Sequence, residues 1–115
     1  MDVSTARKRL EGTRDELDRS IMVLESDHPL EQRGEMAPDP ADAGTNLSET
    51  ERTEAVMTVV KQQLAEVLGA LHRIDDGSYG TCVDCGQRVP EGRLEAKPEA
   101  ARCVACQGRR DRLRR

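Results

Sequence analysis

"YGTCVDCGQRVPEGRLEAKPEAARCVACQ", residues 79–107, contains all four cysteines of the chain, in two Cys-x-x-Cys pairs with 17 residues between them. One such pair forms a turn that can present two thiolates to the same metal ion, and the loop between the pairs can return a second turn to complete a tetrahedron. The pattern predicts one structural zinc ion bound by Cys82, Cys85, Cys103 and Cys106. Four protein ligands leave no open coordination position, so a catalytic metal is not expected. Gly86, directly after the first pair, is expected to supply a positive φ.

Paired cysteines also occur in disulfides and in redox enzymes. The N-terminal sequence is too polar for a secretory signal, and no apolar run approaches the roughly 20 residues that span a bilayer. A cytoplasmic, reducing location is therefore expected, and disulfides are disfavoured. A Cys-x-x-Cys redox enzyme would need a βαβ scaffold, of which the sequence shows no sign. A zinc–thiolate centre that releases its metal on oxidation stays open as a second role, and a redox-responsive adaptor built on such a centre is an alternative function. His28 and His72 are expected to be solvated side chains rather than ligands.

The rest of the chain favours an elongated helical structure. Its 115 residues include no Trp or Phe and one Tyr, and 35% of them are charged. Aromatic side chains normally supply much of the burial in a globular core, so a narrow apolar seam is expected instead. Apolar residues recur every three or four positions in one stretch: Met57, Val60, Leu64, Val67, Leu71 and Ile74. This is coiled-coil spacing. A capping box at Ser48 and Glu51 and a stop at Gly77 predict a helix over 48–76, about 43 Å long at the standard rise.

A weaker seam lies upstream, with Val3, Leu10, Leu17 and Leu24 at intervals of seven and Ala6, Thr13 and Ile21 between them. Ser4 or Thr5 is expected to cap this helix, and a break or kink is expected near Pro29. Residues 33–46, "RGEMAPDPADAGTN", lack periodicity and are predicted to form a turn.

The predicted fold class is therefore mainly α, with a long antiparallel coiled-coil hairpin and a small C-terminal four-cysteine zinc finger. The hairpin covers residues 1–77 with an acidic tip loop near 33–46, and the finger covers residues 78–115 with a short basic tail. Two helices of a globular bundle are the alternative. A short helix is expected after Cys106, in the Arg-rich segment, whose arginines are expected to be solvated. A monomer is expected.

Charge is unevenly distributed along the chain. The total is −4, but residues 1–76 carry 17 acidic and nine basic residues, whereas residues 77–115 carry five acidic and nine basic residues. This asymmetry disfavours a nucleic-acid-binding surface along the whole chain. It is compatible with a local basic patch in the C-terminal part. GATA-type DNA-binding fingers share the cysteine spacing, so DNA binding is an alternative. The finger offers few basic residues for it, namely Arg88, Arg93, Lys97 and Arg102. No nucleophile–base pair or phosphate loop is present, so the protein is not expected to be an enzyme.

The cysteine segment shares further residues with one family, namely Tyr79, Gly80, Gly86, Arg93, Leu94, Ala96, Pro98 and Gln107. In these it resembles the DksA/TraR family of bacterial transcription regulators. The resemblance is dense over roughly residues 75–107 and looser back to the connector. It implies a protein that binds RNA polymerase directly and inserts its coiled coil through the secondary channel. It implies modulation of initiation without sequence-specific DNA recognition, and no membrane partner.

The family carries Asp-x-x-Asp-x-Ala at its coiled-coil tip, and "DPADAG" offers Asp39, Asp42 and Gly44 at these positions. The resemblance implies that the two aspartates act near the catalytic magnesium of polymerase or the basic residues around it. Asp before Pro also favours turns, so a purely structural role is the alternative. Gly44 replaces Ala and is expected to weaken the effect on transcription while leaving binding intact.

The resemblance has consequences for one possible ligand. Some family members form, together with polymerase, a site for the stringent-response alarmone ppGpp. The resemblance implies ppGpp as a ligand only jointly with RNA polymerase, through residues that the sequence does not identify. Any contact that relatives make through an extended N-terminal region is not expected here.

Overall fold

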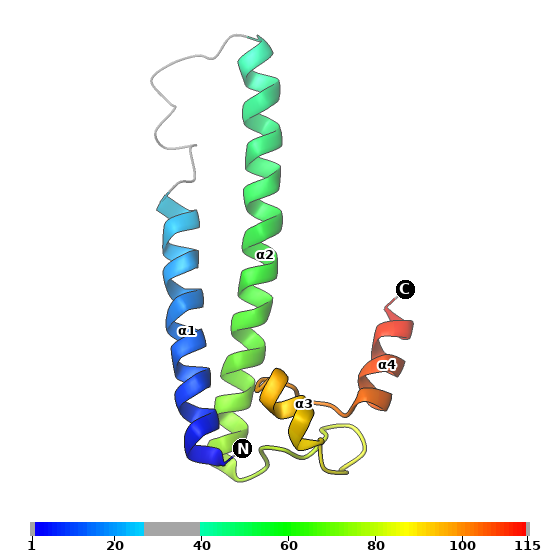
Figure 1. Ribbon diagram of the computed structural model, residues 1–115. Helices are drawn as coiled ribbons and strands as arrows, with labels where there is room; N and C mark the ends of the chain where they lie inside the picture. Colours follow the sequence, from blue (N-terminus) through cyan, green and yellow to red (C-terminus); the bar gives the residue numbers. More distant parts are fainter. Residues whose placement is uncertain (1, 27–39, 115) are drawn as a thin grey trace. The chain divides into compact units, whose positions relative to one another are not determined.

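The computed structural model describes residues 2–26 and 40–114, and for residues 40–47 it describes the backbone alone. Its helices are α1 (Val3–Ser26), α2 (Pro40–Asp76), α3 (Glu91–Ala96) and α4 (Val104–Leu113) (Figure 1). Extended pairing within the described residues is limited to one isolated antiparallel bridge, between Thr81 and Arg88. The mainly α fold class is confirmed. None of the described helices is long and apolar enough to cross a membrane.

The chain divides into two compact units. Unit 1 comprises residues 1–15 and 65–115, and unit 2 comprises residues 16–64. In each unit a segment of α1 runs antiparallel to a segment of α2. In unit 1 the Arg7 guanidinium lies 2.9 Å from the Asp75 carboxylate, and in unit 2 Leu24 and Val56 line one hollow.

Helix α1 begins with a side-chain cap at Asp2 rather than at the predicted Ser4 or Thr5. The backbone N–H of Thr5 donates to the Asp2 carboxylate at 2.7 Å. This hydrogen bond lowers the pKa of Asp2, as expected for a carboxylate that satisfies a free donor at a helix start. The helix ends at Ser26, ahead of Pro29 in the sequence.

Helix α2 begins at Pro40, eight residues before the predicted start at Ser48. Proline is favoured at the first helical position because it has no N–H to leave unpaired there. Once a helix is nucleated each further residue is added cheaply, so the capping box at Ser48 does not interrupt it. Asp42 and Gly44 therefore lie in the first turns of α2 and not in a loop, while Asp39 lies outside the described residues. The extra residues add about 12 Å of helix at the standard rise.

The end of α2 matches the predicted stop at Gly77. This glycine has φ +84°, a conformation that costs other residues more. The chain reversal lets the N–H groups of Ser78 and Tyr79 donate to the carbonyl of Arg73, at 2.9 and 3.1 Å. The reversal leads directly into the cysteine segment.

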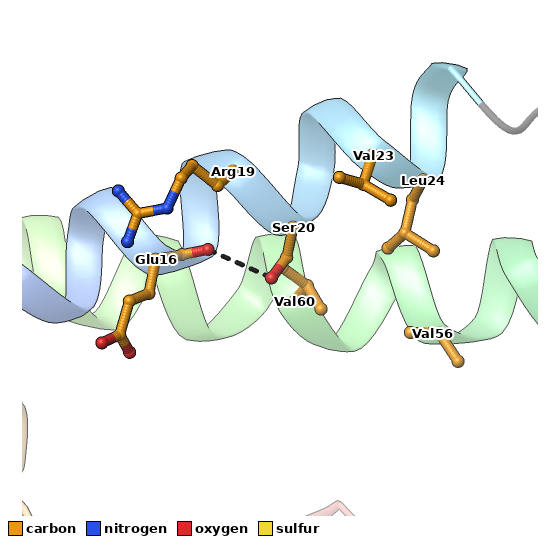
Figure 2. Close-up of a pocket in the computed structure, with 7 residues that line it drawn as sticks. All are labelled: Glu16, Arg19, Ser20, Val23, Leu24, Val56 and Val60. Atoms are coloured by element: carbon orange, nitrogen blue, oxygen red, sulfur yellow. Dashed lines mark hydrogen bonds between the residues drawn. The ribbon is translucent and has the colours of Figure 1, made fainter.

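Both predicted seams form the least exposed faces of their helices, but they are buried to different depths. In unit 1, Ala6, Leu10, Val67 and Ala70 are at most 1% exposed. In unit 2 the seam residues are half-buried: Leu17, Ile21, Leu24, Met57, Val60 and Leu64. Val23 and Val56 are largely exposed there and help to line a hollow of about 550 Å³ between α1 and α2 (Figure 2). Val3, the first predicted seam residue, is half exposed.

We expect this difference in burial to appear in the free energy of unfolding. Leu10→Ala should lower it by about 3 kcal/mol, because the deleted atoms leave a cavity in a closely packed seam. Leu24→Ala should cost about 1 kcal/mol, because its side chain already contacts solvent. Urea unfolding followed by circular dichroism measures both. Equal losses would show that the seam of unit 2 is packed as tightly as that of unit 1.

Candidate metal centre

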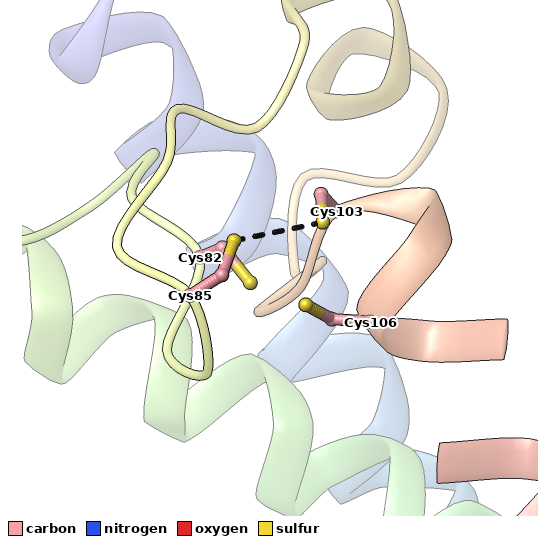
Figure 3. A group of neighbouring side chains, drawn as sticks. All are labelled: Cys82, Cys85, Cys103 and Cys106. Carbon is pink, nitrogen blue, oxygen red and sulfur yellow. Dashed lines mark hydrogen bonds between the residues drawn. The ribbon is translucent and has the colours of Figure 1, made fainter. Parts of the chain in front are cut away.

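The four cysteines of unit 1 converge on one point. Their Sγ atoms all lie within 4.8 Å of one another, and the Cys85 and Cys103 sulfurs are 3.9 Å apart (Figure 3). Tetrahedral zinc with Zn–S bonds of about 2.3 Å places its sulfurs about 3.8 Å apart, so the donor set fits this ion. All four thiols are free of disulfides. Cys82 and Cys106 are buried, whereas Cys85 is exposed.

The first pair sits in a tight turn held by the backbone. The Cys82 N–H donates to the Gln87 carbonyl at 2.7 Å, and the Gly86 N–H donates to the Cys82 carbonyl at 3.0 Å. Gly86 adopts φ +75°, as predicted. The turn closes across the Thr81–Arg88 bridge. Because both thiols are on this short turn, their separation is set locally.

The second pair lies at the start of α4, one turn earlier than the predicted helix after Cys106. Cys103 is the extended residue before the helix, with φ −68° and ψ 167°, and Cys106 is in its first turn. The Gln107 N–H donates to the Cys103 carbonyl at 2.9 Å. Helix N-termini favour thiolates, because their free N–H groups and dipole stabilise negative charge.

Backbone N–H groups favour the thiolate form at two of the sulfurs. The N–H groups of Cys103 and Cys85 lower the pKa of Cys82 to about 6. The N–H of Cys106 lowers the pKa of Cys103. A hydrogen bond with the Cys103 sulfur in turn raises the pKa of Cys106 to about 12, because it stabilises the protonated Cys106 thiol, and burial acts in the same direction. A divalent cation among the sulfurs would favour all four thiolates together.

Contacts outside the ligands join the two turns. Arg102 Nε lies 2.7 Å from an Asp84 carboxylate oxygen, and the Val83 N–H donates to the Ala101 carbonyl at 3.0 Å. Arg93 Nε donates to the Arg102 carbonyl at 2.9 Å. We refer to the Asp84–Arg102 pair as the knuckle clamp. The sequence analysis did not predict this ion pair. An acidic residue between the two cysteines of the first pair and a basic residue directly before the second pair could have indicated it.

Several residues shared with the resembled family have structural roles around the cysteines. The Tyr79 hydroxyl donates to the Pro98 carbonyl at 2.9 Å, and burial raises the pKa of Tyr79. Gly80 has φ +89°, and a Cβ there would lie 3.7 Å from the buried Leu94 side chain. These residues therefore fix the loop that carries the ligands.

Arginines of α1 and α2 hold the finger within unit 1. Arg9 Nη1 donates to the Glu95 carbonyl at 2.8 Å, and Arg73 Nη2 donates to the Glu99 carbonyl at 3.4 Å. Burial lowers the pKa of Arg73. Because a guanidinium can satisfy carbonyls that would otherwise lack donors, the finger is anchored on the helices by polar contacts.

The contacts made by the basic residues of the finger disfavour the DNA-binding alternative. Arg93 binds a carbonyl, Arg102 binds Asp84, and Lys97 lies 3.8 Å from the Glu66 carboxylate of α2. Side chains that recognise the nucleobases of DNA must be free to reach them. Two of the four basic residues named from the sequence, Arg93 and Arg102, are thus held by short hydrogen bonds within the protein.

The structure does not bring the predicted tip residues into the cysteine cluster. Asp42 and Gly44 belong to α2 within unit 2, whereas all four cysteines belong to unit 1. Asp39 lies outside the described residues. The four cysteines and Asp42 are therefore parts of different units and are treated as separate candidate sites.

Known proteins share both the cysteine segment and the fold. Residues 77–112 match the family model of the prokaryotic dksA/traR C4-type zinc finger. The "RNA polymerase-binding transcription factor DksA" of Caulobacter vibrioides strain NA1000 is 36% identical over 88 residues, which cover 75% of this chain and 61% of the relative. "General stress protein 16O" of Bacillus subtilis is 39% identical over 67 residues, which cover 58% of this chain and 41% of that relative. The chain thus spans about three fifths or less of the length of these relatives. The structure of transcription factor DksA2 from Pseudomonas aeruginosa has the same fold, with a TM-score of 0.80 at 23% identity over 97% of this chain and 84% of that one.

The knuckle clamp should contribute measurably to stability. A double-mutant cycle of Asp84→Asn and Arg102→Gln is expected to give a coupling free energy of about 1 kcal/mol, falling at high salt, because the pair is short but partly exposed. The same cycle at the longer Glu66–Lys97 pair serves as the control, with an expected coupling near zero. Urea unfolding at two salt concentrations provides the values. Equal coupling in the two pairs would contradict a specific clamp.

Proposed function

This chain belongs to the DksA/TraR family of C4-type zinc-finger proteins, and we propose that it regulates transcription by binding RNA polymerase directly. The observation that carries the proposal is the cluster of four sulfurs inside the segment that matches the family's zinc finger. A relative with this segment is named an RNA polymerase-binding transcription factor. The regulator acts on the polymerase rather than on a promoter sequence, in keeping with the internal contacts of Arg93 and Arg102.

The four cysteines hold one structural zinc ion. Their sulfur spacing fits tetrahedral coordination, and two of the four are part of the buried cluster of the finger. Zinc supplies stability to this region, since structural sites of this kind contribute about 10–16 kcal/mol of apparent binding free energy. The ion has no catalytic role, because the four thiolates complete its coordination.

Purified protein should contain one zinc ion per chain. Cys106→Ser is expected to reduce zinc occupancy severely and to lower the helical signal, because a hydroxyl is a poor zinc ligand and Cys106 is in the first turn of α4. Elemental analysis and circular dichroism provide the two readouts. Val83→Ala, an exposed change inside the first pair, should retain the metal. Full zinc occupancy in Cys106→Ser would exclude this cysteine from the site.

The proposed mechanism is insertion of the α1–α2 pair through the secondary channel, with Asp39 and Asp42 acting near the active centre. The continuation of α2 to Pro40 supports this, because it places Asp42 on a helix instead of a loose loop. Carboxylates there can act on the hydrated catalytic magnesium or on the basic residues around it. Gly44 adds backbone freedom within the same turns, at a cost of about 1 kcal/mol relative to Ala, and weakens the effect on transcription without weakening binding.

The effector role of the aspartates is tested by in vitro transcription from a ribosomal-RNA-type promoter with the cognate polymerase. The wild-type protein should change transcript yield severalfold. Asp39→Asn/Asp42→Asn should bind core polymerase with unchanged affinity but lose this effect, because amides do not carry the charge that acts on the metal or its basic neighbours. Transcript yield and polymerase affinity are measured in parallel, with and without ppGpp.

Glu49→Gln/Glu51→Gln is the matched control. It makes the same change in charge at exposed positions of α2 and should regulate like wild type. Acidic residues are favoured in the first turn of a helix, so circular dichroism verifies that α2 is intact in each variant. Normal regulation by the Asp39/Asp42 variant would exclude the effector role, and absence of polymerase binding by the wild type would exclude the proposed function.

A redox response of the zinc–thiolate centre is a second candidate. It is favoured by the exposure of Cys85, which is the most exposed residue among the four cysteines. Thiolates that are accessible oxidise first, with release of the metal. Such a response would appear as peroxide-triggered zinc release that changes transcription in the assay above.

A further inference from the structure

A hollow of about 350 Å³ lies against the cysteine cluster in unit 1 and is lined by Asp84, Cys85, Cys106, Arg109, Arg110 and Leu113. Two cysteines therefore contact the same open space as two arginines of α4. The two arginines are adjacent in sequence and both are exposed, but they differ in their relation to the sulfurs.

Arg109 contacts the cluster directly. Its Nη2 atom donates a hydrogen bond to the Cys106 sulfur at 3.3 Å. The two residues are three positions apart on α4 and so lie on the same face of the helix. Arg110 lines the hollow one position further along, where the helix has turned by about 100°.

The hydrogen bond from Arg109 to Cys106 matters because the zinc-bound cluster would carry a negative charge. Zinc bound by four thiolates is an anion overall, since the thiolates outnumber the charges of the ion, and nearby cations stabilise it. The first turn of α4 supplies part of the compensation through its dipole. Arg102 is also near the ligands, but its charge is paired with Asp84 at 2.7 Å. The guanidinium of Arg109 is the cationic group that donates to a ligand sulfur among the described contacts.

We propose that Arg109 is a positioning residue of the metal centre, which holds Cys106 on the zinc ion through its N–H···S hydrogen bond. The inference rests on the proposed binding of zinc by the four cysteines. A thiolate that accepts a hydrogen bond has less charge to offer a competing proton or electrophile, so the bond slows the loss of this ligand. Groups that orient metal ligands in this way commonly change metal affinity by about 10–100-fold.

The experiment compares the zinc-loaded full chain with Arg109→Gln, Arg109→Lys and Arg110→Gln. Zinc affinity and the rate of zinc transfer to a chromogenic chelator are measured for each. Arg109→Gln should weaken affinity about tenfold, the low end of the usual range because the side chain is exposed. Arg110→Gln, which removes the same charge from the same hollow, should change affinity less than about twofold, and Arg109→Lys should restore part of the loss.

Cobalt substitution adds a readout that a general loss of structure would not give. The thiolate-to-cobalt charge-transfer band should move to longer wavelength in Arg109→Gln, because the sulfur lone pairs are no longer stabilised by the hydrogen bond. It should be unchanged in Arg110→Gln. Circular dichroism verifies that α4 is intact in both variants.

The outcomes separate this inference from the proposals on which it rests. Equal effects of Arg109→Gln and Arg110→Gln, or wild-type affinity and spectrum in Arg109→Gln, would overturn the role of Arg109 while leaving the zinc site in place. A wild-type chain that binds no zinc would overturn the zinc site and this inference together. Polymerase binding is measured independently and bears on neither readout.

Discussion

The convergence of four thiols within 4.8 Å is the constraint on which the finger depends. Two of the five residues in the buried cluster of the finger are cysteines, Cys82 and Cys106, and the others are Val89, Leu94 and Ala100. So few apolar atoms bury little surface, and at roughly 25 cal/mol per Å² they stabilise the fold only weakly. The proposed metal binding and the formation of this core therefore involve the same side chains. Without an ion, the four cysteine side chains at the centre of the finger would have no shared metal to hold the two turns together.

Polar contacts supply what the missing aromatic residues cannot. The chain has no Trp or Phe, and in unit 1 the carbonyls of the ligand-bearing loop are bound by Arg9, Arg73 and Tyr79. Long side chains of this kind cover apolar surface with their stems while their polar ends bind the backbone. Most of the apolar seam in unit 1 is buried, with Val3 as the exception, whereas the seam in unit 2 is half-buried. The unit that contains the four cysteines is thus the more extensively packed of the two.

The less extensive packing of unit 2 is compatible with the proposed function. An element that acts inside another protein completes its burial against that partner, and needs only enough intramolecular packing to stay helical. Helix α2 extends to Pro40 and so includes Asp42 and Gly44 in regular backbone. If the aspartates act on the polymerase active centre, a helical support limits the entropy lost when they are positioned there.

The pairing of the four cysteines in two turns, the two seams and the stop at Gly77 were determined by the sequence alone, because turns and heptads are local patterns with fixed spacings. The start of α2 was not, because a capping box at Ser48 competes with a helix already propagating from Pro40, and the two cannot be ranked from local signals. Only the tertiary structure decided that Arg102 pairs with Asp84 and that Lys97 lies beside Glu66. It also decided which arginine of the C-terminal segment meets a ligand sulfur. Such contacts depend on the path of the chain between residues and on the direction in which each helix face points, and neither is contained in the spacing of residue types.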